Sequence, residues 1–158
     1  RPSADPGQLA EAARLTGLPA LGDASGLVVD ALDGGPGIYS SRYAGEGADD
    51  VSNNRRLLDA LAGVDASGRS AHFYCAMALL RHAGDPAPLI ATGQWDGRIL
   101  EAPAGSDGFG YDPLFWVPGE GCTAAQLPAD VKNRLSHRGQ ALNALLRQLP
   151  GEFSPSMA

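Results

Sequence analysis

Cysteine is scarce in this chain, and the two that are present lie far apart. Cys75 and Cys122 are the only cysteines in the 158 residues. They form no CxxC pair, so a metal or redox motif of that type is excluded. We expect both thiols to be reduced and mostly buried, and a structural disulfide is the less favoured alternative.

Long apolar segments are also lacking. No run approaches the ~20 apolar residues that a membrane-spanning helix requires. The first ten residues contain no apolar core of the kind found in signal peptides. We therefore expect a cytoplasmic protein with no membrane partner.

Basic residues are few. The chain has 12 Lys and Arg against 18 Asp and Glu, and its net charge is -6. Binding to a nucleic-acid backbone depends on dense Lys and Arg, so a nucleic-acid polymer is excluded as a partner. The hydrophobic content of 44% is ordinary for a globular protein of this size, and we expect a single domain.

The pattern of apolar residues predicts both helices and strands. Residues 18–21 and 27–32 are short apolar runs that predict two strands, with residues 22–26 as a polar loop between them. A capping pattern predicts a helix from Asp5, and helical spacing predicts another over residues 53–61.

The second half of the chain predicts an antiparallel meander followed by a helix. Residues 72–80 and 89–95 predict strands joined by a turn, and the segment 95–98, Trp-Asp-Gly-Arg, predicts a second bend. A helix is expected from about Ser136. Its buried side is expected to carry Leu142, Leu145, Leu146 and Leu149.

Three loops contain residues that are suited to chemistry: GDASGL (22–27), GFGYDP (108–113) and KNRLSHRGQAL (132–142). Each loop has a purely structural interpretation when it is considered alone. Asp23 and Ser25 suit an Asx turn, the glycines of the second loop suit a bend, and Ser136 suits a helix N-cap.

Together the three loops provide the groups that bind a nucleotide. The ring of Phe109 can stack on a base, where stacking is worth ~1 to 3 kcal/mol. Cationic side chains can donate to keto oxygens or phosphate, and a helix N-terminus adds unpaired backbone N–H groups. The groups concerned are the carboxylate of Asp112 and the cluster of Lys132, Arg134, His137 and Arg138.

At these motifs the sequence resembles the inosine/xanthosine triphosphate pyrophosphatases, which are house-cleaning nucleotide hydrolases. The resemblance runs from about Ala12 to about Leu149, through TGLPAL, SGLVVDAL, GGPGIYSSRYAG, GFGYDPLFWVP and KNRLSHRGQAL. It implies a mixed α/β fold with an elongated central sheet flanked by helices. In such a fold two lobes enclose a nucleotide cleft, and the protein is usually a homodimer.

The resemblance also implies a reaction and a set of site residues. Non-canonical purine nucleoside triphosphates such as dITP, ITP and XTP would be hydrolysed, with Mg²⁺, to the monophosphate and pyrophosphate. The substrate would be held by Ser25, Phe109, Gly110, Tyr111, Asp112, Lys132, His137 and Arg138.

Two features depart from the family pattern. Ala24 occupies the position of the family's second acid, which is its metal ligand and presumed general base, so Asp23 is the weaker catalytic and metal-binding candidate. The family's first strand and its phosphate loop have no counterpart, and we expect residues 1–158 to be one domain that is truncated at its N-terminus. The alternative function is a catalytically inactive nucleotide-binding or dimerisation module.

Overall fold

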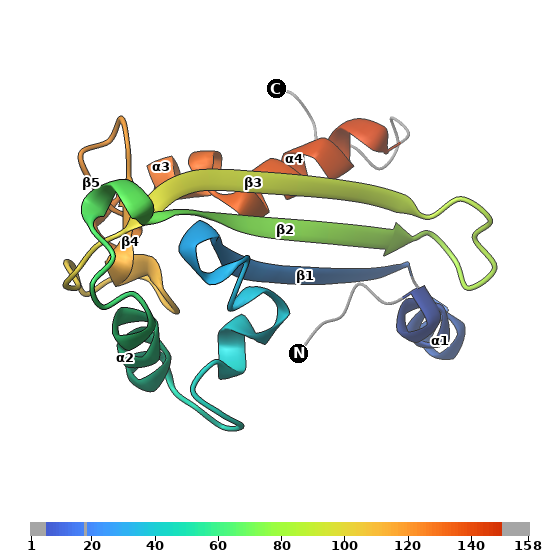
Figure 1. Ribbon diagram of the computed structural model, residues 1–158. Helices are drawn as coiled ribbons and strands as arrows, with labels where there is room; N and C mark the ends of the chain where they lie inside the picture. Colours follow the sequence, from blue (N-terminus) through green and yellow to red (C-terminus); the bar gives the residue numbers. More distant parts are fainter. Residues whose placement is uncertain (1–5, 18, 150–158) are drawn as a thin grey trace. The chain divides into compact units, whose positions relative to one another are not determined.

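The computed structural model describes residues 6–17 and 19–149 as a mixed α/β fold, which confirms the predicted fold class (Figure 1). A five-stranded sheet has the order β1-β2-β3-β4-β5, so strands that follow one another in the sequence are neighbours. β3 pairs with β4 and β4 with β5, both antiparallel.

The strands are β1 (Ala20–Val29), β2 (Ser70–Leu80), β3 (Leu89–Ile99), β4 (Phe115–Val117) and β5 (Cys122–Thr123). The helices are α1 (Pro6–Thr16), α2 (Asp50–Ala60), α3 (Ala129–Leu135) and α4 (His137–Gln148).

Two predicted breaks in the strands are wrong. Residues 22–26 lie inside the single strand β1, and residues 95–98 lie inside β3. The glycines there allow close approach of another backbone and do not make turns. A Cβ on Gly26 would lie 2.4 Å from the carbonyl oxygen of Gly37, and a Cβ on Gly97 would lie 2.4 Å from that of Trp116. Residue 18, part of the first predicted strand, lies outside the described residues.

The predicted start of α4 is confirmed, and the predicted start of α2 is wrong. α2 starts three residues earlier than predicted, because the Asp49 carboxylate caps it and accepts from the Ser52 N–H at 2.8 Å. α4 starts directly after its N-cap Ser136, as predicted. Leu142 is 41% exposed, so its predicted burial is wrong, and the buried side of α4 is formed by Ala141 and Leu145. The predicted cap Asp5 lies outside the described residues.

Residue contacts divide the chain into two compact units. Unit 1 comprises residues 1–25, 75–94 and 136–158, and unit 2 comprises residues 26–74 and 95–135. Within unit 1, α4 runs alongside β3 (Figure 1), and Ala141 and Leu145 pack with Cys75, Met77 and Ala91. The expectation that the whole chain forms one domain stays a prediction.

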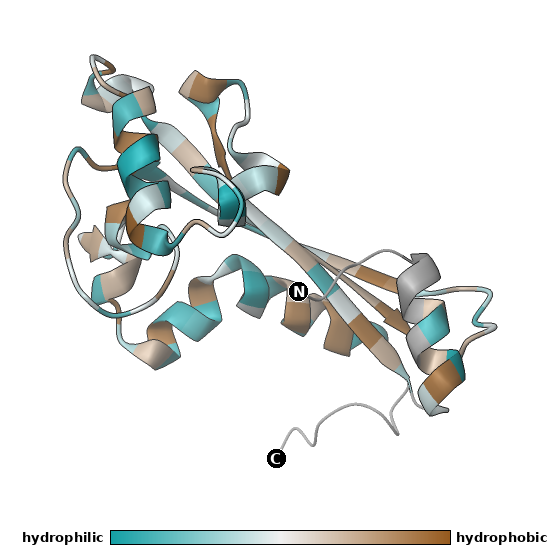
Figure 2. Cartoon of the chain, turned by 90° about the horizontal axis from the view of Figure 1, so that it is seen from below, coloured by the Kyte–Doolittle hydropathy of each residue, from teal (hydrophilic) through white to brown (hydrophobic). Residues whose placement is uncertain are grey.

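Unit 2 has the larger core, and aromatic side chains are at its centre. The ring centroid of Phe115 lies 4.4 Å from that of Phe73 and 5.3 Å from that of Trp95. α2 contributes Leu57 and Leu61 to this core, and both are fully buried. Hydrophilic and hydrophobic residues alternate in bands along the long strands (Figure 2). Across the described ranges, every helix is too short or too polar to cross a bilayer.

Candidate active site

The GFGYDP loop of unit 2 is organised around the carboxylate of Asp112. This side chain is buried, and its Oδ2 accepts from the Phe109 N–H at 3.1 Å. Gly108 has φ +82°, and a Cβ there would lie 2.4 Å from the same oxygen. Glycine is therefore required at this position both for its backbone conformation and for the space that Asp112 occupies.

Lys132 on α3 completes this group. Its Nζ lies 2.5 Å from Asp112 Oδ2 and 4.8 Å from the centroid of the Phe109 ring. Phe109 as a residue is 62% exposed. A partly buried ion pair thus stands beside an exposed aromatic ring, and the ammonium group lies within cation–π range of that ring.

Tyr111 supports the loop from within unit 2. Its side chain is buried, and its hydroxyl donates to the Ser40 carbonyl oxygen at 2.6 Å. Burial, assisted by the negative potential of Tyr43 and Asp50, raises the pKa of this phenol above its ordinary value. The hydroxyl is protonated, and its O–H already makes a hydrogen bond inside the protein. The predicted contact of Tyr111 with substrate would therefore involve its backbone.

A second group forms in unit 1, where α4 meets β1. The Arg138 guanidinium donates to the Ser25 hydroxyl oxygen at 3.2 Å and lies 3.8 Å from Asp23 Oδ2. Asp23 and Ser25 are two residues apart on one strand, so their side chains leave the same face. Ala24 leaves the opposite face.

The start of α4 is brought close to β3. Ser136 caps the helix and accepts from the Gly139 N–H at 3.1 Å. A Cβ on Gly93 would lie 2.1 Å from the carbonyl oxygen of His137, so glycine in β3 permits this approach. His137 is the first residue of α4 and is half-buried. These contacts fix the backbone from which Arg138 extends.

Cys75 lies in unit 1 but does not provide a nucleophile. It is buried, and burial followed by the negative charge of Asp23 raises the pKa of its thiol to about 11. At neutral pH the group is a thiol, whereas cysteine nucleophiles are thiolates. The structure thus presents Cys75 as a buried thiol without the features that activate a cysteine.

The predicted site residues thus fall into two sets of contacts, one in each unit. Unit 2 brings together Phe109, Asp112 and Lys132, and unit 1 brings together Asp23, Ser25 and Arg138. The convergence of both sets on one nucleotide stays a prediction. Gly110 and Tyr111 are held by hydrogen bonds inside unit 2.

Two residues that contact the site were not predicted from the sequence. Asp50 Oδ2 accepts from the Gly110 N–H at 2.9 Å, and Asn54 Nδ2 donates to the Gly110 carbonyl oxygen at 2.9 Å. The two side chains are four residues apart on α2 and so lie on one helix face. Their spacing of four residues is the only sequence feature that links these two side chains. It does not indicate which loop that face of the helix contacts.

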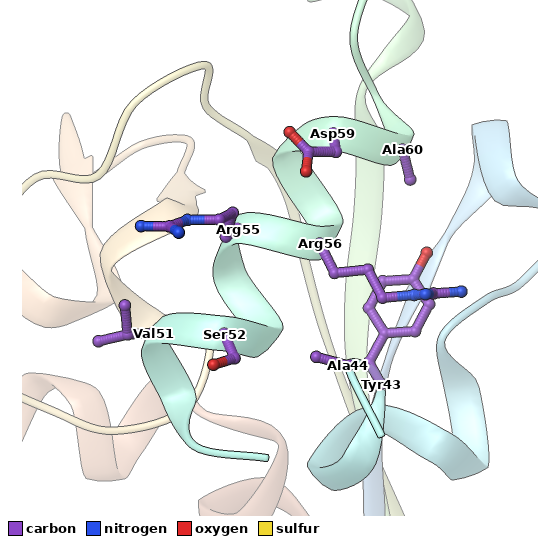
Figure 3. Close-up of a pocket in the computed structure, with 8 residues that line it drawn as sticks. All are labelled: Tyr43, Ala44, Val51, Ser52, Arg55, Arg56, Asp59 and Ala60. Carbon is purple, nitrogen blue, oxygen red and sulfur yellow. The ribbon is translucent and has the colours of Figure 1, made fainter.

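A pocket of about 600 Å³ lies on another part of α2 (Figure 3). In Figure 3 the Arg56 side chain extends over the Tyr43 ring, and its guanidinium carbon lies 4.7 Å from the ring centroid. The pocket is lined by Tyr43, Ala44, Val51, Ser52, Arg55, Arg56, Asp59 and Ala60. None of the predicted site residues lines it.

The described residues do not form a magnesium site by themselves. Within residues 6–17 and 19–149, no three acidic, histidine or cysteine side chains are grouped as metal ligands. Asp23 offers one carboxylate, and Arg138 already lies 3.8 Å from it. A protein that binds Mg²⁺ through one carboxylate depends on water and substrate phosphates for the other ligands.

Comparison with known proteins gives concordant matches. The family model described as the Ham1 family matches residues 7–148. A Vibrio cholerae protein named dITP/XTP pyrophosphatase is 54% identical over 87% of this chain and 69% of its own length. An Escherichia coli O157:H7 protein with the same name is 55% identical over 87% of this chain and 70% of its own length.

Solved structures agree with these sequence matches. A HAM1 protein from Coxiella burnetii superposes with a TM-score of 0.80 at 51% identity, over 86% of this chain and 69% of that one. The Ham1 protein of Staphylococcus aureus superposes with a TM-score of 0.83 at 39% identity, over 92% of this chain and 73% of that one. The fold and the sequence therefore point to the same relatives.

Proposed function

The chain belongs to the Ham1 family, and we propose that it hydrolyses non-canonical purine nucleoside triphosphates to the monophosphate and pyrophosphate. The proposed substrates are dITP, ITP and XTP. The observation that carries the proposal is the exposed Phe109 ring beside the Lys132 ammonium and the Asp112 carboxylate. The names of relatives that are more than 50% identical support the same reaction.

The proposed recognition of the base depends on hydrogen-bond donors. Hypoxanthine and xanthine carry a keto acceptor at the six position, whereas adenine carries an amino donor there. Lys132 and Arg138 have only donors, so a base with a carbonyl is accepted and adenine leaves a donor unpaired. An unpaired buried donor costs ~1 to 3 kcal/mol. The Phe109 ring adds stacking that does not depend on the identity of the base.

The side chains have distinct proposed roles in the reaction. Phe109 would stack on the base, and Lys132, His137 and Arg138 would each donate to the edge of the purine. Ser25 contacts the substrate. Asp112 holds Lys132 and the Phe109 backbone in place through the contacts at its Oδ2. Water attacks the α-phosphate, the bond to the bridging oxygen breaks, and pyrophosphate leaves.

We propose Mg²⁺ as the metal of this reaction, which would neutralise charge on the triphosphate. Asp23 would be the weak candidate for a protein ligand, with substrate phosphates and water as the other oxygen ligands. A homodimer in the cytoplasm is also proposed. The exposed apolar side chains of Ile38 and Tyr39 in unit 2 support an association surface, which sedimentation analysis would test.

Incubation with Mg²⁺ and single nucleotides tests the reaction. We expect pyrophosphate release from ITP, dITP and XTP with a kcat/KM on the order of 100-fold above that for ATP, because adenine leaves a donor unpaired. Pyrophosphate and monophosphate are measured separately for each nucleotide. Binding of ITP by calorimetry without any hydrolysis would instead favour an inactive nucleotide-binding module.

Replacing Asp112 by alanine tests the site of unit 2. We expect the KM for ITP to rise by about 10- to 100-fold, because both Lys132 and the Phe109 backbone lose their partner and base stacking is worth ~1 to 3 kcal/mol. Asp112→Asn is the matched control, since it keeps an acceptor oxygen for the Phe109 N–H and loses the charge. Steady-state kinetics are compared with thermal unfolding of each variant. An unchanged KM in a folded Asp112→Ala protein contradicts the assignment.

A further inference from the structure

Two side chains of α2 hold both hydrogen-bonding groups of Gly110. The Gly110 N–H donates to Asp50 Oδ2, and the Gly110 carbonyl oxygen accepts from Asn54 Nδ2, each at 2.9 Å. Asn54 Nδ2 also donates to the Asp50 carbonyl oxygen at 2.7 Å. Because two carbonyl oxygens face this nitrogen, the reversed amide would set oxygen against oxygen. The orientation of Asn54 is thus determined by its contacts.

Gly110 follows the exposed ring of Phe109 directly. Its φ of +60° is left-handed, so the chain turns sharply after the ring. Because Phe109 is 62% exposed, burial does not fix its ring, whose direction depends mainly on the backbone that carries it. On one side that backbone is bonded to Asp112 through the Phe109 N–H, and on the other it is held by α2 through Gly110.

We infer that Asp50 and Asn54 are positioning residues for the base-stacking ring of Phe109. This inference rests on the proposed function and adds to it two residues that act only through Gly110. The two bonds order the loop when the protein folds. The substrate then binds a loop that is already ordered. If the loop had to become ordered on binding, the free-energy cost of ordering it would weaken the affinity for substrate.

Loss of the two hydrogen bonds from Gly110 to Asp50 and Asn54 is expected to change KM and kcat differently. A loop that must be ordered by the substrate weakens ground-state and transition-state binding equally, which raises KM and leaves kcat unchanged. A purely structural role of Asp50 and Asn54 in α2 predicts instead a loss of folded protein with normal KM. The split between KM and kcat therefore separates the two roles.

The test uses the full chain with Asp50→Ala, Asn54→Ala and the conservative variant Asp50→Asn. We expect the KM for ITP to rise by about 5- to 10-fold in the two alanine variants, with kcat within about twofold of wild type. Asp50→Asn keeps an acceptor oxygen and is expected to restore most of the affinity. Amide exchange of the Gly110 N–H, followed by NMR, is expected to accelerate in Asp50→Ala and to stay slower in Asp50→Asn.

Asp49→Ala is the matched control on the same helix. Asp49 caps α2 through the Ser52 N–H and makes no hydrogen bond to Gly110. Its loss is expected to lower the midpoint of thermal unfolding and to leave the KM for ITP within about twofold.

Each outcome bears on one of the two proposals. If wild type releases no pyrophosphate from ITP, the proposed function fails and the positioning role fails with it. If wild type is active and the alanine variants keep its KM, or if Asp49→Ala raises KM as much as they do, the positioning role alone is overturned.

Discussion

Replacing Ala24 by aspartate is expected to raise the kcat for Mg²⁺-dependent pyrophosphate release from ITP by about 100-fold or more. A general base contributes roughly 10²- to 10⁴-fold to such a reaction, and the carboxylate also adds an oxygen ligand for Mg²⁺. Alanine provides neither group. The family resemblance places an acid at this position, so the substitution adds a base and an oxygen ligand that the wild-type chain lacks there.

The local structure explains why Asp23 is a poor replacement for that acid. Its carboxylate already lies 3.8 Å from the Arg138 guanidinium, so it has a cationic partner within the protein. Adjacent residues on a strand also point to opposite faces, so Asp23 cannot supply its oxygen where residue 24 points. A carboxylate at residue 24 thus adds a group that β1 otherwise lacks on that face.

Ala24→Asn is the matched control for this prediction. It has nearly the same size and shape as aspartate but cannot accept a proton from water at neutral pH. We expect little gain from it, and we expect chelation of Mg²⁺ by EDTA to abolish the gain of Ala24→Asp. Equal activity of the asparagine and aspartate variants, or a gain that survives EDTA, contradicts the prediction.

Replacing Arg69 by methionine is expected to lower the free energy of unfolding by about 3 to 5 kcal/mol, because three buried or partly buried carbonyl groups each lose a donor. Arg69 is 4% exposed. Its guanidinium donates to the carbonyl oxygens of Val64 at 2.8 Å, Leu61 at 3.0 Å and Leu100 at 3.1 Å. These bonds tie the end of α2 and the loop after it to the end of β3.

Urea denaturation followed by circular dichroism measures this loss. Arg69→Lys is the control, because it keeps the charge and the apolar stem but lacks the planar fork that reaches three acceptors. We expect a smaller loss of about 1 to 3 kcal/mol for lysine than for methionine. A loss below about 1 kcal/mol in Arg69→Met would mean that water replaces the guanidinium at these carbonyls.

The contrast between the two units indicates where substrate affinity is sensitive to change. In unit 2 the loop that carries Phe109 donates hydrogen bonds to Asp112 and Asp50 and accepts one from Asn54. In unit 1 the Arg138 guanidinium contacts Ser25 and Asp23 directly. Substitutions of Asp50 and Asn54 on α2 are therefore expected to act on the backbone of the loop that carries Phe109. Substitutions of Asp23 and Ser25 on β1 are expected to act on the Arg138 side chain.

Much of this protein was predictable from its sequence. The motifs that carry Phe109, Asp112, Lys132 and Arg138 indicated the family, and the Ser136 cap of α4 was visible as a local pattern. Such features are local in the chain, because a cap or a glycine-rich loop is specified by residues within a few positions of one another. The continuous courses of β1 and β3 were missed, because a glycine that permits close packing has the same letter as a glycine that makes a turn.

Only the tertiary structure decided which distant groups support the loop that carries Phe109. Asn54 and Asp50 reach Gly110 across 56 and 60 residues, and Lys132 reaches Asp112 across 20. No periodicity encodes such pairs, since they depend on how α2 and α3 pack within unit 2. The sequence by itself determined the chemical groups and the family, and the packing of the helices determined which of those groups meet.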